Sequence, residues 1–292
     1  MRIHYYLMKK FYQLIFTIIL IGIIVLFSAS IHTSKNDLLH GFVEQTKMFG
    51  HSLIHLKEMI ILVGAFQKET PLWSYMKEPY LYSFIILSSA FICAFALGIL
   101  FSYGTYLLSP KMRKFVKECL FLLQSIPDVM FIFAVQLFII WIYKKTNILI
   151  VDPIAGIEKV YLLPILVVSI LPGIMLFQMT FLAIEEESKK TYVEFAKAKG
   201  LSNGWILLKH ILRNVVVTLF SHSHYLFWLL VSNLLVVEYL FNIHGFFQLL
   251  YTALKTPDAF YVCLVALFLP FFLIEMIFNG IAIKLTGKEQ TQ

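Results

Sequence analysis

Six apolar stretches, each long enough to cross a lipid bilayer, dominate this sequence of 292 residues. A helix needs roughly 20 residues to span the hydrocarbon layer. Each stretch must be helical, because an open strand in lipid would leave its backbone N–H and C=O groups without hydrogen-bond partners. We therefore predict an all-α integral membrane protein with six transmembrane helices, at about residues 11–31, 81–108, 119–142, 161–184, 215–241 and 261–283.

The composition excludes an ordinary soluble domain, which would carry about a quarter charged residues. Here hydrophobic residues make up 60% of the chain and charged residues 14%. The net charge of +7 is scattered among the apolar stretches and forms no continuous patch, which argues against nucleic-acid binding. Cys93, Cys119 and Cys263 show no paired spacing, so the sequence contains neither a disulfide framework nor a CxxC metal site.

The positive charges predict the orientation in the membrane. With both termini on one side, 15 of the 24 Lys and Arg residues fall on that side, in a shorter length of non-membrane chain than the other nine occupy. The side richer in Lys and Arg is normally cytoplasmic. We therefore expect both termini and the loop at about residues 185–213 to face the cytoplasm.

Three parts follow along the chain. Residues 1–80 are predicted to form the first helix and an extracytoplasmic segment, residues 81–284 a core of five helices, and residues 285–292 a cytoplasmic tail. Lys9-Lys10 and Ser28-Ala29-Ser30 could flank a cleaved signal peptide. We favour a retained helix, because the apolar run is longer than a usual signal core. Apolar residues at helical spacing within 32–80 predict an amphipathic helix at the membrane surface: Phe49, Leu53, Leu56, Ile60 and Ile61.

A polar, lysine-rich segment at residues 192–214 separates the fourth and fifth apolar stretches. Gly200 can adopt a positive φ angle and end a short helix that begins near Tyr192. Ser202 can then cap the start of a second, amphipathic helix. The apolar face predicted for that second helix comprises Trp205, Leu208, Ile211 and Leu212.

The same segment is either a docking element or a solvated basic loop that only sets the topology. Its small residues leave room for the backbone of a partner to come close: Ala196, Ala198 and Gly200. Polar contacts around them can come from Glu194, Lys197 and Lys199.

The order of these residues resembles a known family. Glu194-Phe195-Ala196, followed by Lys197-Ala198-Lys199 and then Gly200, resembles the coupling loop of ABC importer permeases, in which Glu-Ala-Ala, three residues and Gly follow one another. The whole string 192–214 is similar to the dipeptide, oligopeptide and nickel branch of that family. The resemblance assigns coupling to an ATPase subunit to Tyr192, Glu194, Ala196, Lys197, Ala198, Lys199, Gly200 and Leu201.

The resemblance also implies an architecture and a set of partners. The fold would be that of a type I ABC importer permease in a bacterial plasma membrane, with a coupling helix between helices 4 and 5. Partners would be two ATP-binding subunits, a second permease subunit and an extracytoplasmic substrate-binding protein, with ATP and Mg bound by the partner subunits. The sequence itself lacks GxxxxGK followed by Ser or Thr: Gly287-Lys288 precedes Glu289. We therefore expect a transport subunit without enzymatic activity and without a cofactor of its own.

The sequence identifies residues of the translocation route less specifically than those of the coupling loop. Ser125-Ile126-Pro127 resembles the family's Ser-Ile-Pro, and residues 238–254 resemble its segment after the fifth helix. Pro127 should bend the third helix. Asp128 and Glu238 are costly in lipid and should face the protein interior, so each either lines or gates the route or is a structural carboxylate. Pro164 and Pro172-Gly173 in the fourth stretch are likewise predicted kink sites, with a looser resemblance to the family, and Glu275 is a weaker candidate carboxylate.

Several features set limits on the resemblance. Residues 31–35 lack the family's Pro-Gly-Asp-Pro-like stretch, Phe177-Gln178-Met179 stands where an arginine is common, and Arg213 stands where many members have proline. The histidines are better explained as polar surface residues than as metal ligands: His51, His55, His222 and His224.

Other functional classes remain as alternatives. An ion-coupled secondary transporter would use Asp128, Glu238 and Glu275 as a relay, and a permease for nickel or another small solute would differ only in substrate. A membrane-embedded enzyme would need polar residues clustered on facing helices, and those here are dispersed. A degenerate permease could also act only in assembly or regulation.

Overall fold

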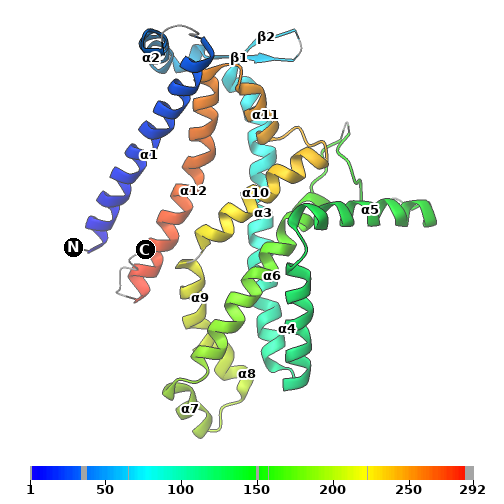
Figure 1. Cartoon of the computed structure of the whole chain (residues 1–292). Helices are drawn as coiled ribbons and strands as arrows, with labels where there is room; N and C mark the ends of the chain where they lie inside the picture. The colour runs from blue at the N-terminus through cyan, green and yellow to red at the C-terminus, as the bar shows by residue number, and fades with distance from the viewer. Residues whose placement is uncertain are drawn as a thin grey trace. The chain divides into compact units, whose positions relative to one another are not determined.

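The computed structural model describes residues 2–33, 38–64, 66–148, 151–156, 158–221 and 223–286 (Figure 1). The chain divides into two compact units. Unit 1 comprises Met1–Ser83 and His244–Ile277, and unit 2 comprises Phe84–Ile243 and Phe278–Gln292. Most of the tail predicted at 285–292 lies outside the described residues.

Unit 1 combines long apolar helices with a small β-hairpin. Its elements are α1 (Arg2–Thr33), α2 (Leu38–Ile54), the 3-10 turn η1 (Leu56–Glu58), β1 (Ile60–Val63), β2 (Lys68–Pro71), the start of α3 (Leu72–Leu107), α11 (Phe246–Ala253) and most of α12 (Pro257–Thr286). Its core gathers side chains from the hairpin and from α3, α11 and α12, with Ile61, Leu72 and Ala259 fully buried.

The hairpin corrects part of the prediction for residues 32–80. The amphipathic helix is α2, which ends at Ile54. Ile60 and Ile61, which we predicted on the same helix, instead form β1, where Ile61 lies opposite Thr70 in an antiparallel pair. Four apolar residues in a row, two of them adjacent isoleucines, favour a strand, and pairing with β2 satisfies their backbone groups.

Unit 2 is built around α6. Its elements are the remainder of α3, α4 (Pro110–Gln124), α5 (Asp128–Thr146), α6 (Leu162–Glu187), α7 (Thr191–Ala198), α8 (Asn203–Ile206), the π-helical turn η2 (Leu207–Ile211), α9 (Leu212–Ser221) and α10 (Ser223–Leu240). Helix α3 approaches α6 closely because Gly98 has no side chain: a Cβ there would lie 2.7 Å from the Cβ of Leu176. Ser102 Oγ donates a hydrogen bond to the Phe177 carbonyl across the same contact, at 3.0 Å.

The described residues contain five helices long and apolar enough to cross a membrane, and one shorter apolar helix. The five are Met8–Ile31, Leu72–Leu107, Asp128–Thr146, Leu162–Glu187 and Pro257–Ile277, and the shorter one is Tyr225–Leu240. Five long spans and one shorter helix agree with the fold class and with the six apolar stretches. The boundaries of two stretches differ from the prediction.

The third stretch, predicted at 119–142, is not one helix. Helix α4 ends at Gln124, and α5 begins at Asp128 with Pro127 as its N-cap. Proline has no N–H to donate, and it also disfavours a helical conformation of Ile126 before it. Pro127 therefore separates two helices, which run in different directions in Figure 1, instead of bending one.

The fifth stretch, predicted at 215–241, begins earlier than expected. Its described helical residues are Leu212–Ser221 (α9) and Ser223–Leu240 (α10). Helix α9 follows directly from the π-helical turn η2. The helical course of the lysine-rich segment therefore continues into this stretch without a loop between them.

Candidate docking site

The lysine-rich segment folds into the two short helices predicted for it. Helix α7 ends at Ala198, and Gly200 has a φ of 75°. The Gly200 amide donates to the Lys197 carbonyl at 2.9 Å, and the Leu201 amide donates to the Ala196 carbonyl at 3.3 Å. These two bonds form a Schellman motif, whose left-handed residue is usually glycine. Gly200 therefore ends α7 as predicted.

The second helix begins at Ser202, whose Oγ accepts a hydrogen bond from the Trp205 amide at 3.4 Å. The cap was predicted, but the buried face was predicted only in part. Trp205 and Leu208 are 49% and 57% exposed, whereas the buried residues are Ile206, Leu207, Ile211 and Leu212. The π-helical turn η2 explains the difference, because its i to i+5 spacing places 206 with 211 and 207 with 212 on the inner face.

The inner face of the segment is anchored in the core of unit 2. Val193 and Ala196 of α7 are buried in one cluster with Ile184 of α6 and Leu207. We expected Ala196 to offer space to a partner, but it is only 7% exposed and packs inward. Its small side chain instead allows α7 to lie close to the core, whereas Ala198 and Gly200 are on the open surface.

The outer face carries an unusual combination of aromatic, aliphatic and cationic side chains. Four large apolar residues are exposed here: Phe195 (66%), Leu201, Trp205 and Leu208. Exposed lysines lie among them in the sequence: Lys197, Lys199 and Lys209. The Lys209 ammonium lies 4.9 Å from the centre of the Trp205 ring, a cation–π contact. We call this surface, with Glu194 and Gly200, the outer face.

A hydrogen-bond network that we did not predict fastens the segment at both ends. The buried Glu187 accepts bonds through Oε1 from the Tyr192 hydroxyl and from Asn214 Nδ2, both at 2.8 Å. Asn214 Nδ2 also lies 3.2 Å from the Tyr192 oxygen, and Lys190 pairs with the other carboxylate oxygen. The run Glu185-Glu186-Glu187 after an apolar stretch was the available signal, but it could not show which carboxylate is buried.

Tyr192 is therefore more than a surface residue of the segment. Burial, together with the hydrogen bond and the charge of Glu187, raises the pKa of Tyr192 to about 12, although Asn214 acts in the opposite direction. The hydroxyl keeps its proton at any physiological pH. It is thus a permanent hydrogen-bond donor to Glu187.

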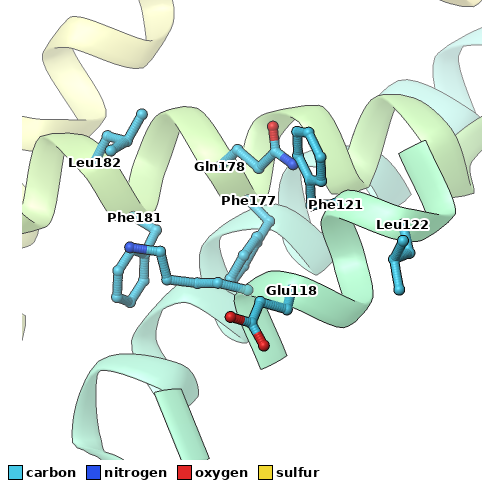
Figure 2. A pocket seen from close by; sticks show the side chains of 8 residues that line it. Glu118, Phe121, Leu122, Phe177, Gln178, Phe181 and Leu182 are labelled. Carbon is cyan, nitrogen blue, oxygen red and sulfur yellow. The ribbon is translucent and has the colours of Figure 1, made fainter. Parts of the chain in front are cut away.

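Helices α4 and α6 line an open hollow of about 570 Å³ (Figure 2). It is mainly apolar and is lined by Lys117, Glu118, Phe121, Leu122, Phe177, Gln178, Phe181 and Leu182. The Lys117 ammonium lies 4.8 Å from the centre of the Phe181 ring and 3.5 Å from a Glu185 carboxylate oxygen. Phe177 and Gln178 both line this hollow. They belong to the run Phe177-Gln178-Met179, which differs from the arginine expected there from the resemblance.

The predicted route residues are all in unit 2, and their roles stay predictions. Pro127 is exposed, and Asp128 is half-buried in the first turn of α5, where the helix dipole stabilises a carboxylate. Glu238 is 3% exposed near the end of α10. Its burial agrees both with a gating role and with a structural one.

Glu275, the weaker candidate, has a partner in unit 1. Its carboxylate is 2.8 Å from the Lys10 ammonium, so it joins α12 to α1. This ion pair gives Glu275 a structural explanation that needs no transport role.

The histidine positions show no metal-binding arrangement within the described ranges, where no three His, Cys, Asp or Glu side chains come together. His51 and His55 stack on each other, with ring centres 4.4 Å apart. His222 and the side chain of His224 lie outside the described part of the chain.

Comparison with known proteins places most of unit 2 in one family. The model of the binding-protein-dependent transport system inner membrane component matches residues 94–285. The glutathione transport system permease protein GsiC of Escherichia coli (strain K12) is 30% identical over 98 residues, which cover 34% of this chain and 32% of that protein. The metal-staphylopine import system permease protein CntB of Staphylococcus aureus is 27% identical over 174 residues, covering 57% and 53%. The chain therefore spans a third to a half of these relatives.

Proposed function

We propose, from the premise that this chain belongs to the family of binding-protein-dependent transport system inner membrane components, that it is the membrane-spanning permease subunit of an ATP-driven importer. The outer face is its docking surface for an ATP-binding subunit. In this proposal the chain moves a solute and makes or breaks no bonds in it.

We call the lysine-rich segment, residues 192–214, the docking segment, and its two-sided character is the observation that carries the proposal. The inner side is held in the core through Val193, Ala196 and Leu207, so the segment is not a loose loop. The outer side exposes Phe195 and Trp205 to solvent. Exposed aromatic residues with cations around them are typical of protein interfaces, whereas a loop that only sets topology needs positive charge alone.

The charge of the outer face suggests what the partner offers. The outer face is positively charged, because it carries one acidic residue, Glu194, and three lysines: Lys197, Lys199 and Lys209. A partner with an apolar cleft for Phe195 and an acidic rim would match both features. ATP binding would close the two ATP-binding subunits on each other. The docking segment would move with the subunit it contacts, and the membrane helices would alternate between outward-open and inward-open states.

A pull-down tests the docking surface directly. The tagged chain is purified in mild detergent from its native membrane, and the proteins that accompany it are identified by mass spectrometry. We expect an ATPase with a Walker motif. Phe195→Glu should weaken its retention about tenfold or more, because the charge would replace an apolar anchor at the interface.

A matched control uses another exposed phenylalanine. Phe66 lies at the hairpin of unit 1 and is fully exposed, so Phe66→Glu makes the same chemical change away from the outer face. It should leave the ATPase bound. A chain that purifies alone and moves solute down an ion gradient would overturn the proposal in favour of the ion-coupled transporter that uses Asp128 and Glu238.

For the substrate we propose a small peptide. The support is the similarity to a glutathione permease, together with the likeness of residues 192–214 to the peptide branch of the family. The similarity to a metal-staphylopine permease favours a second candidate, a small solute that carries a metal ion. Mass spectrometry of the small molecule bound to a co-purifying substrate-binding protein decides between them: a peptide without metal supports the first, and a metal complex the second.

A further inference from the structure

The last turn of α6 carries three successive carboxylates, Glu185, Glu186 and Glu187. Successive residues of a helix point about 100° apart, so the three side chains leave the helix in different directions. A carboxylate is unfavourable at the C-terminal end of a helix, where the dipole is negative. The stability of α6 itself therefore does not explain this run.

Glu187 connects three helices through one carboxylate. Its Oε1 accepts hydrogen bonds from Tyr192 at the start of α7 and from Asn214 at the start of α9, each at 2.8 Å. Asn214 Nδ2 and the Tyr192 oxygen, 3.2 Å apart, complete a triangle. The docking segment is thus fastened at its beginning and at its end to the same residue of α6.

Glu185 points to the other side of α6, towards α4. Its carboxylate lies 3.5 Å from the ammonium of Lys117, and Lys117 lines the hollow between α4 and α6 (Figure 2). The same turn of α6 therefore contacts the docking segment on one side and a wall of the hollow on the other. Glu186, between them, is exposed, and within the described ranges its side chain forms no hydrogen bond or ion pair.

We propose that Glu187 is a positioning residue that makes the docking segment and α6 move as one body, so that displacement of the segment reaches the hollow between α4 and α6. The inference rests on the proposed function. A charged acceptor with several donors holds them more firmly than neutral pairs do. Without it, α7 keeps the apolar packing of Val193 and Ala196 and the bond between Asn214 and Tyr192, but it loses the side-chain hydrogen bond that joins it to α6.

An exchange of side chains tests the network with little change in shape. Asn214→Asp places a second carboxylate at hydrogen-bond distance from Glu187, and two like charges so close repel each other. Glu187→Gln combined with Asn214→Asp restores one carboxylate and one amide, with both side-chain lengths kept. Glu186→Gln, one residue away and exposed, is the control.

The readout is the accessibility of the hollow, which needs no knowledge of the substrate. Cys93, Cys119 and Cys263 are replaced by alanine, and Gln178→Cys introduces a single thiol in the hollow. The complete transporter with its ATPase subunits is labelled with a maleimide, with and without ATP and vanadate, and rates are expressed per assembled complex. If Glu187 were needed only for folding, the substitutions would lower the amount of complex and leave the labelling response of each complex to ATP and vanadate unchanged.

In the parent and in Glu186→Gln, we expect trapping with ATP and vanadate to change the labelling rate several-fold. Asn214→Asp should bring the labelling rates with and without trapping close to each other, a loss in the range of ordinary coupling energies, and the double variant should restore the difference. An unchanged response of Asn214→Asp, or no recovery in the double variant, would overturn the role of Glu187. A parent that retains no ATPase would refute the proposed function instead.

Discussion

Gly200 offers the sharpest test of the docking surface, because the structure separates what a side chain would do inside the chain from what it would do to a partner. Gly200 has a φ of 75°, and a Cβ built on it meets no atom within 4 Å. Alanine there would cost only backbone strain, about 1–2 kcal/mol. Such a cost lowers the unfolding temperature by a few degrees at most, so the variants should fold.

With asparagine or aspartate at position 200, most of the strain caused by the positive φ is avoided. Both tolerate the left-handed region, and this chain already places Asn147 and Asn242 there, with φ of 55° and 52°. Gly200→Asn therefore adds bulk with little strain, and Gly200→Asp adds similar bulk with a negative charge. Comparing them with Gly200→Ala separates strain, bulk and charge.

We expect the ATPase to remain bound in all three variants, because Phe195 and Trp205 are unchanged. Coupling, followed through ATP-driven labelling of the Gln178→Cys thiol, should fall with added bulk and be lost in Gly200→Asp. Burying an unpaired charge against a partner adds a further cost. A full response in Gly200→Asp would refute the argument that a partner's backbone approaches this glycine.

Two further predictions concern stability, each measured by thermal unfolding in detergent. Gly98→Ala should lower the free energy of unfolding by about 1–3 kcal/mol through overpacking, because its Cβ would lie 2.7 Å from that of Leu176. The control Gly104→Ala adds a Cβ that meets nothing within 4 Å and should be neutral or stabilising. Equal unfolding midpoints for the two variants would contradict the close contact of α3 with α6. Glu275→Gln should destabilise unit 1 by about 1–3 kcal/mol, less than for a fully buried pair because Glu275 is 28% exposed. Combining it with Lys10→Met should recover part of that loss, and strictly additive effects would show that the pair contributes nothing.

The features that sequence predicted well are local ones. Gly200 and Ser202 set the end of one helix and the start of the next through hydrogen bonds that span at most five residues. Such bonds depend on the residue types alone, so the turn could be found without any tertiary contact. The apolar stretches are local in the same sense, because a bilayer demands their length and composition whatever their neighbours are.

Errors arose where backbone chemistry competed with composition. Residues 119–142 are mostly apolar, yet Pro127 divides them into α4 and α5. The π-helical turn η2 likewise shifts the buried face from Trp205 and Leu208 to Ile206 and Leu207. An apolar pattern with a period of 3.6 residues cannot show such a turn, because one extra residue per turn changes every later position.

The sequence by itself determined that this chain is a helical membrane protein with a capped, basic segment between two apolar regions. Tertiary structure alone decided which side of that segment is free. Ala196 turns into the core while Phe195 beside it stays exposed, and Glu187 is selected from three equal carboxylates by Asn214, 27 residues away. The physical reason is that burial and hydrogen bonding between distant residues depend on how the helices pack, which no local pattern of residue types specifies.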